Sequence, residues 1–187
     1  RGGGPGARGE ALIRSPACSA WSYLGGMITS HVLVKMALDA WTNELKYTNA
    51  LLEKLTDDRL MQAVSPGRNR GIYLLGHLTA VHDQILPLLR FQETMYPELY
   101  GPFHDEPDGA VADLPPISQL RAQWKEVNDA LLKHMMGLAP EEWFTRHANI
   151  SEEDFPKEPH RNRLNVVISR TNHLAYHRGQ LALLASK

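Results

Sequence analysis

Three histidines in this sequence stand at positions from which they can bind one metal ion. His173 and His177 are four residues apart, which places two side chains on one helix face with Cβ atoms about 5–6 Å apart. Two imidazoles at that separation can share a divalent ion through metal–nitrogen bonds of about 2.0–2.1 Å. The pair alone is weak evidence, because such short motifs also occur by chance. His177 also falls on an apolar stripe, however, and a buried imidazole there needs a polar partner.

The third histidine, His77, is selected by its depth in the expected fold. It lies beside the apolar stripe of another predicted helix, where a lone histidine is more often a structural core residue. If these two helices are antiparallel, His77 and the pair His173 and His177 lie roughly 10–17 Å from the same end of the bundle, at 1.5 Å per residue. We therefore predict one metal site with the ligands His77, His173 and His177.

The remaining histidines do not fit this site. His82 is about 140° around its helix from His77, and His134 should lie roughly 12 Å further along the bundle. Asp83 is rotated about 240° from His77, so it is not expected to be a fourth ligand. His31 falls at the far end of its helix. The others lie in predicted loops and are expected to be solvated: His104, His147 and His160.

Four stretches of the sequence have the apolar periodicity of amphipathic helices. Apolar residues recur at alternating spacings of four and three, which is typical of helices that pack around a shared core, in residues 30–55, 69–89, 118–138 and 162–184. Pro87 is expected to kink or end the second helix. Residues 91–116 carry five prolines and no period, and so long a connection fits a crossover between parallel helices. We predict an all-α domain, an up-down-down-up antiparallel four-helix bundle with a long crossover between helices 2 and 3.

Composition narrows the possible partners and the cellular setting. The formal net charge is −1, without the basic excess typical of nucleic-acid-binding proteins. No apolar run approaches the ~20 residues that span a bilayer. The single cysteine, Cys18, excludes an internal disulfide, and this fits a cytoplasmic protein. We expect neither nucleic acid nor membrane as a partner.

The N-terminal residues differ from the rest of the chain. Residues 1–26 are rich in glycine and lack an apolar period, and Met27 directly precedes the first periodic stretch. We interpret residues 1–26 as a disordered leader or a non-native extension, and residues 27–187 as the domain.

Three segments resemble the DinB/YfiT-like superfamily of four-helix-bundle metalloproteins. They are YLLGHLTAVHDQILPLLR at residues 73–90, YPELYGPF in the crossover, and NRLNVVISRTNHLAYHRGQLALL at residues 162–184. The resemblance spans residues 27–184. It implies an up-down-down-up bundle with a three-histidine metal site formed by His77, His173 and His177. Some members of the superfamily are thiol-dependent enzymes that use mycothiol, bacillithiol or glutathione, and many have no assigned reaction.

The favoured hypothesis for function is a metal-dependent enzyme. Three neutral histidines leave an open coordination position, as in catalytic sites, for zinc, nickel, iron or copper. The ion would lower the pKa of a bound water or thiol of a small substrate, which suits a thiol-dependent S-transferase or a hydrolase. Further residues could line or support the site, although surface or packing roles are open for each: Glu44, Thr48, Arg170, Arg178 and Gln180.

Two alternatives remain at this point. No Asp or Glu lies within a helical turn of a ligand histidine, and the missing general base favours a non-catalytic metal or small-ligand binding module of a stress response. The third possibility is a structural bundle that acts through homodimer contacts, which exposed Trp143 or Phe144 would mark.

Overall fold

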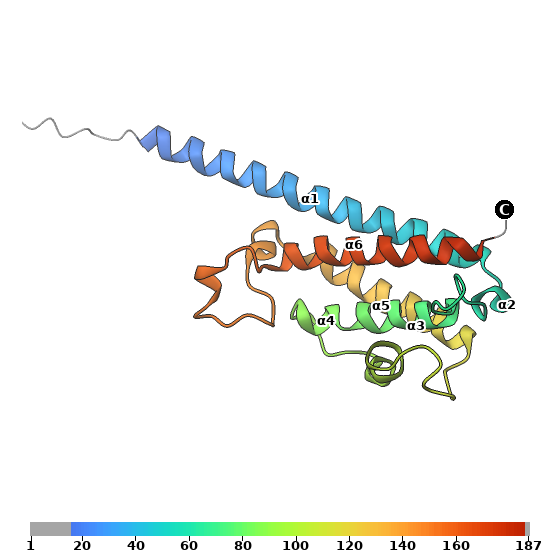
Figure 1. Cartoon of the computed structure of the whole chain (residues 1–187). Helices are drawn as coiled ribbons and strands as arrows, with labels where there is room; N and C mark the ends of the chain where they lie inside the picture. Colours follow the sequence, from blue (N-terminus) through green and yellow to red (C-terminus); the bar gives the residue numbers. More distant parts are fainter. Residues whose placement is uncertain (1–15, 186–187) are drawn as a thin grey trace, which may run out of the picture.

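The computed structural model describes residues 16–185, and the regular secondary structure in this range is helical, without a β-strand (Figure 1). The long helices are α1 (Pro16–Lys54), α3 (Gly71–Asp83), α5 (Ile117–Gly137) and α6 (Arg163–Leu181). The short ones are α2 (Asp57–Leu60), α4 (Ile85–Leu88), η1 (Pro97–Leu99), η2 (Gly101–Asp105), η3 (Pro140–Phe144), η4 (Phe155–Lys157) and η5 (Ala182–Leu184). The predicted all-α class is therefore confirmed for the described range.

Helix α1 begins earlier than the sequence suggested. It starts at Pro16 rather than near Ser30, so residues 16–26, which we expected in a disordered leader, are helical. Residues 1–15 lie outside the described range. The N-terminal part of α1 extends well beyond the other helices (Figure 1).

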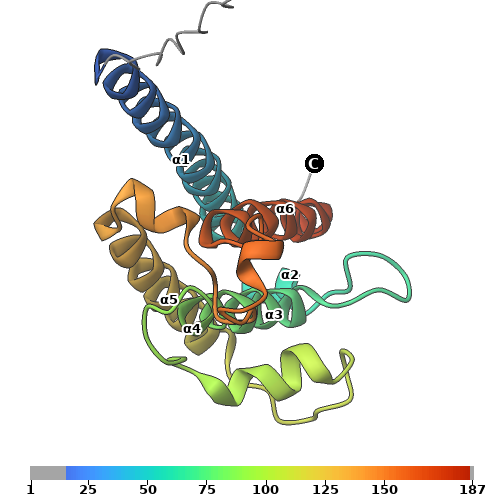
Figure 2. The same ribbon diagram turned by 90° about the vertical axis from the view of Figure 1, so that its left-hand side faces the viewer.

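The predicted apolar stripes are the surfaces on which the long helices pack. Helix α1 packs along α6, and α3 packs along α5, with the crossover covering the outer side of α3 (Figure 2). Stripe residues from every long helix are buried, among them Trp41, Leu78, Leu120 and Leu174. Each such side chain contributes about 1.5–3 kcal/mol by leaving water. Trp143 is also fully buried, so it does not mark the contact surface that the structural-bundle alternative would use.

The second bundle helix is interrupted where the sequence placed a proline. Helix α3 ends at Asp83, and the four-residue α4, which contains Pro87, follows it. Proline lacks an N–H and cannot continue an i to i−4 ladder. The Asp83 carboxylate accepts hydrogen bonds from the backbone N–H groups of Met95 and Tyr96, each at 2.8 Å. This aspartate therefore anchors the start of the crossover to the end of α3.

The crossover is more ordered than its prolines suggested. It contains η1 and the π-helix η2, and it buries the Phe103 ring against α3. A Cβ atom on Gly76 would lie 2.4 Å from that ring, which is closer than atoms can approach. Glycine at this position therefore lets the crossover lie directly on α3, one residue before His77.

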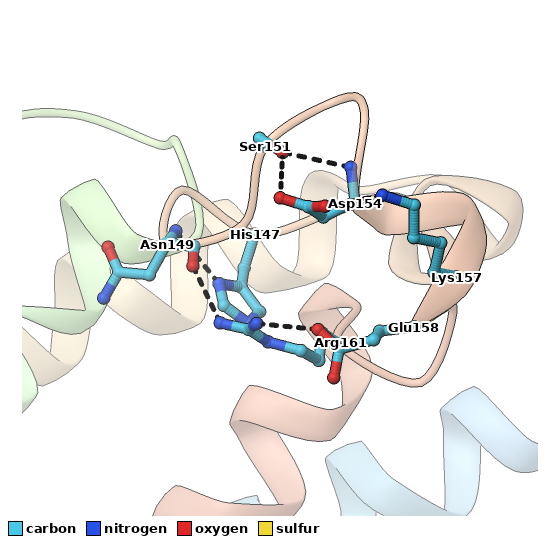
Figure 3. A network of polar contacts seen from close by, with 7 residues as sticks. All are labelled: His147, Asn149, Ser151, Asp154, Lys157, Glu158 and Arg161. Carbon is cyan, nitrogen blue, oxygen red and sulfur yellow. Dashed lines mark hydrogen bonds and ion pairs between the residues drawn. The ribbon is translucent and has the colours of Figure 1, made fainter.

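The connection between α5 and α6 is held by polar contacts (Figure 3). Arg161 donates to the Asn149 carbonyl at 2.8 Å and to Glu158 at 2.9 Å. Ser151 donates to Asp154 at 2.7 Å, and the Asp154 carboxylate also pairs with Lys157. These contacts order a segment that has no helical period of its own.

None of the described helices combines the length and the apolar character that crossing a membrane requires.

Candidate metal centre

The structure brings the three predicted histidines together. His77 comes from α3, and His173 and His177 come from α6. The Nε2 atom of His173 lies 3.2 Å from Nε2 of His77 and 3.1 Å from Nε2 of His177. One ligand atom from each residue lies within 4.8 Å of the others, and all three side chains are half-buried. Three nitrogens bound to one tetrahedral ion at about 2.0–2.1 Å lie about 3.3 Å apart, so these separations suit a shared ion.

Hydrogen bonds on the far side of two rings fix which nitrogen faces the centre. The Nδ1 atom of His77 lies 2.8 Å from the Phe103 carbonyl oxygen. A carbonyl can only accept, so this Nδ1 carries the proton. The Nδ1 atom of His177 likewise donates to Oε1 of Gln180 at 2.8 Å. In both rings Nε2 is left with a lone pair that points at His173. Such partners orient ligand histidines in metal sites.

The three facing nitrogens are suited to a shared cation. Burial lowers the pKa of His77 and of His177. Burial, and then the positive charges that His177 and His77 would carry, lower the pKa of His173 to about 3. At neutral pH all three rings are therefore uncharged, and the Nε2 atom of His173 can donate to at most one of its two neighbours, while its Nδ1 is buried without a partner in the described part of the chain. A divalent ion complements this arrangement, and neutral imidazole nitrogens suit zinc, nickel, iron or copper.

Comparison with known families supports the same region. The profile of the DinB superfamily matches residues 40–181, well over half of the chain. The chain belongs to the DinB superfamily. The match includes His77, His173 and His177, and the resemblance inferred from the sequence motifs is confirmed. A comparison with curated proteins found no match.

Among the further candidate residues, Gln180 has a position that supports its suggested role of orienting a ligand. The sequence left open whether this amide orients a ligand or faces solvent, and its bond to His177 shows the first arrangement. Glu44 instead forms an ion pair with Arg178, and buried Thr48 donates to the Glu44 backbone carbonyl at 2.9 Å. Two of the candidate residues in this DinB-superfamily chain, Glu44 and Arg178, thus neutralise each other's charge.

His104 is a residue that sequence reasoning missed. We expected it to be a solvated loop residue. In the structure it lies in η2, and its ring stacks on that of His77, with the ring centroids 6.1 Å apart and the ring planes 12° apart. Its Nδ1 lies 3.0 Å from the Asp105 carboxylate, and its Nε2 lies 3.2 Å from the Tyr100 hydroxyl. The ring remains exposed to solvent. The only local signal was the spacing of four between Tyr100 and His104, which the surrounding prolines and glycines obscured. π-Helical turns often occur at functional sites.

The other histidines lie apart from the cluster, as predicted. His82 is fully buried elsewhere in the core, and His134 stacks on Phe91 with its Nε2 3.1 Å from the Gln92 side-chain oxygen. His147 contacts the backbone of its own loop, and His31 and His160 are exposed.

A small cavity opens beside the cluster. It has a volume of about 220 Å³ and is lined by His177 and Gln180 together with Val64, Arg68, Asn69 and Tyr176. One of the three histidines is therefore accessible from a space that can take a small molecule.

Proposed function

We propose that this DinB-superfamily chain is a metal-dependent enzyme whose divalent ion, zinc, nickel or iron, is held by His77, His173 and His177. The observation that carries the proposal is the convergence of three uncharged imidazole nitrogens, two of them held by Phe103 and Gln180. One ring proton cannot satisfy both Nε2 contacts of His173, and a bound cation would satisfy all three nitrogens.

The number of ligands favours catalysis over a closed structural site. Within the described residues, the group offers three ligand atoms, and tetrahedral structural sites use four protein ligands. The remaining position would take water or the substrate, and an ion held by these histidines would supply Lewis acidity that lowers the pKa of a water or thiol. The cavity beside His177 and Gln180 offers space for a small molecule next to one of the three ligands.

His104 and Tyr100 form a candidate proton-transfer pair that the sequence alone did not reveal, because Nε2 of His104 accepts from the Tyr100 hydroxyl. Its imidazole is exposed beside His77, and Asp105 holds the ring through Nδ1. A histidine oriented by a carboxylate is a common general base. This arrangement supports an enzyme over the alternative of a non-catalytic metal or small-ligand binding module of a stress response.

The reaction that we propose is S-transfer from a low-molecular-weight thiol or hydrolysis of a small molecule. We also infer that the four long helices form an up-down-down-up bundle, because the antiparallel arrangement of α3 and α6 would place His77 level with His173 and His177. A cytoplasmic setting and a homodimer remain part of this proposal.

Elemental analysis of the native protein and cobalt substitution test the proposal. We expect one divalent ion per chain, and a visible cobalt spectrum that changes when millimolar 2-mercaptoethanol is added. Such a change requires an exchangeable coordination position. A protein that binds no metal would contradict the metal centre, whereas a cobalt spectrum that ignores thiols and small anions would favour the binding module.

A further inference from the structure

Arg170 stands on the same face of α6 as two of the candidate ligands. It precedes His173 by three residues and His177 by seven, and seven residues are close to two full helical turns. Its side chain is half-buried. The sequence allowed either an anion-attracting role for this arginine or a solvated surface position.

The arginine lacks the partner that comparable arginines have. Across residues 16–185, Arg170 makes no hydrogen bond or ion pair. A half-buried arginine elsewhere in this chain usually binds a carboxylate or a carbonyl oxygen, as is the case for Arg70, Arg121, Arg146, Arg161 and Arg178. Arg163, seven residues earlier on α6, shares the lack of a partner but lies two turns further from the histidines.

The positive charge of Arg170 acts on two histidines of the metal centre. Burial is the main cause of the lowered pKa of His77 and His173, and the positive charge of Arg170 is a further cause for both. Two carboxylates of the neighbouring helices are already engaged, because Asp83 accepts from backbone N–H groups and Glu44 pairs with Arg178. A divalent ion on three neutral histidines would add two positive charges beside the unpaired guanidinium. Such an excess in a half-buried region favours an anionic ligand.

We propose that Arg170 binds the carboxylate of a small anionic substrate whose reacting group reaches the metal centre. This inference rests on the proposed function, and it names the substrate class of that site. A guanidinium fits a carboxylate with two parallel hydrogen bonds, and this pairing provides both affinity and orientation. The substrate is thus a small carboxylic acid that carries a thiol or another metal-binding group.

Two small thiols that differ in charge test the assignment on the cobalt-loaded full chain. Mercaptoacetate offers a thiol and a carboxylate, whereas 2-mercaptoethanol offers a thiol and a neutral hydroxyl. We expect the wild type to bind mercaptoacetate about tenfold more tightly, judged by the cobalt absorption, because a charged hydrogen bond contributes about that factor. Arg170→Gln should lose this preference and keep wild-type affinity for 2-mercaptoethanol. Arg163→Gln is the matched control and should keep the preference.

A second readout separates a binding role from a structural one. In buffer without coordinating anions, Arg170→Gln should bind cobalt as tightly as the wild type or more tightly, because one opposing charge is gone. If this variant does not fold, Arg170→Lys keeps the charge but not the two-pronged geometry, and the preference should fall.

The outcomes distinguish the proposed role of Arg170 from the proposed metal centre. A preference for mercaptoacetate that survives in Arg170→Gln, or is absent from the wild type, would overturn the role of Arg170 while leaving the metal centre intact. A wild type that binds no cobalt would overturn both.

Discussion

His77 and His82 lie five residues apart on α3 and are in opposite chemical situations. His77 is half-buried, and its Nε2 lies 3.2 Å from a nitrogen of another uncharged imidazole. His82 is fully buried, and its Nδ1 donates to the side-chain oxygen of Asn128 at 2.8 Å. The ring of His82 packs between those of Trp41 and Trp124, with centroids 4.9 and 4.8 Å away.

The difference shows that burial does not identify a functional histidine. Burial lowers the pKa of His82 to about 4, so this ring is a neutral part of the core. The hydrogen bond to Asn128 and the two indole rings hold the ring in place, and within residues 16–185 its Nε2 is buried without a hydrogen-bond partner or a second histidine facing it. At His77 the Nε2 lone pair faces His173, whose single ring proton can serve only one of its two neighbours, and a shared cation would satisfy all three nitrogens. Four predictions test whether the two histidines really differ in this way.

The largest effect is expected from removing a ligand. His77→Ala, His173→Ala or His177→Ala should each abolish stoichiometric metal, because two imidazoles bind a divalent ion far less tightly than three. His82→Ala and His134→Ala should keep one ion per chain. Metal content by elemental analysis is the measurement. A His173→Ala protein that retained its full metal would rule out the assignment.

The loss of stability at acidic pH should show that the folded protein holds His82 in its neutral form. Its pKa is about 4 in the folded protein and about 6.5 in the unfolded chain, so the unfolded state takes up a proton first as the pH falls. The stabilisation is complete above pH 6.5 and is lost as the pH falls to 4, which amounts to about 3 kcal/mol in the free energy of unfolding. Urea denaturation of the metal-free protein at pH 7 and pH 4.5 measures this loss.

The control for this prediction is His82→Gln, which cannot titrate but can still bond to Asn128. The pKa values of the three cluster histidines are also lowered, so their contribution appears in both proteins and cancels in the comparison. Identical pH dependence in the two proteins would show that His82 is not held neutral in the core.

Gly76→Ala should weaken metal binding without touching a ligand. Its Cβ would overlap the Phe103 ring, and moving Phe103 displaces the carbonyl that holds His77. Loss of such a partner typically costs about 10–100-fold in metal affinity. Competition with a chelator gives the dissociation constant. Gly179→Ala is the matched control because its Cβ has nothing within 4 Å, and wild-type affinity is expected there. Equal metal affinities for the two variants would show that the Phe103 carbonyl does not support the metal site.

The smallest effect is expected at Gln180. Gln180→Leu removes the acceptor of the His177 Nδ1 proton, and we expect about tenfold weaker metal binding, at the lower end of such effects. Gln180→Glu restores an acceptor and should recover most of the affinity. If Gln180→Leu bound metal like the wild type, the amide would merely lie beside the cavity.

The sequence by itself determined the local part of the site. A spacing of four residues puts His173 and His177 on one face of α6, because helical geometry depends only on separation along the chain. Depth along two helices then selected His77 over His134. The same periodicity identified most core residues of the long helices. The start of α1 was misplaced, because glycine-rich composition and the lack of a stripe gave no sign of a helix from Pro16 onwards.

Only the tertiary structure decided what surrounds the three histidines. The crossover has no period, so nothing in the sequence indicated that Phe103 would hold His77 or that His104 would stack on it. The unpaired state of Arg170 likewise depends on which carboxylates other elements bring near it, and these are taken by the crossover backbone and by Arg178. Helix geometry is a local property that one segment specifies. Hydrogen-bond partners and charge balance instead depend on segments that are distant in the sequence. The chain therefore specifies the candidate ligands locally and completes their environment only by folding.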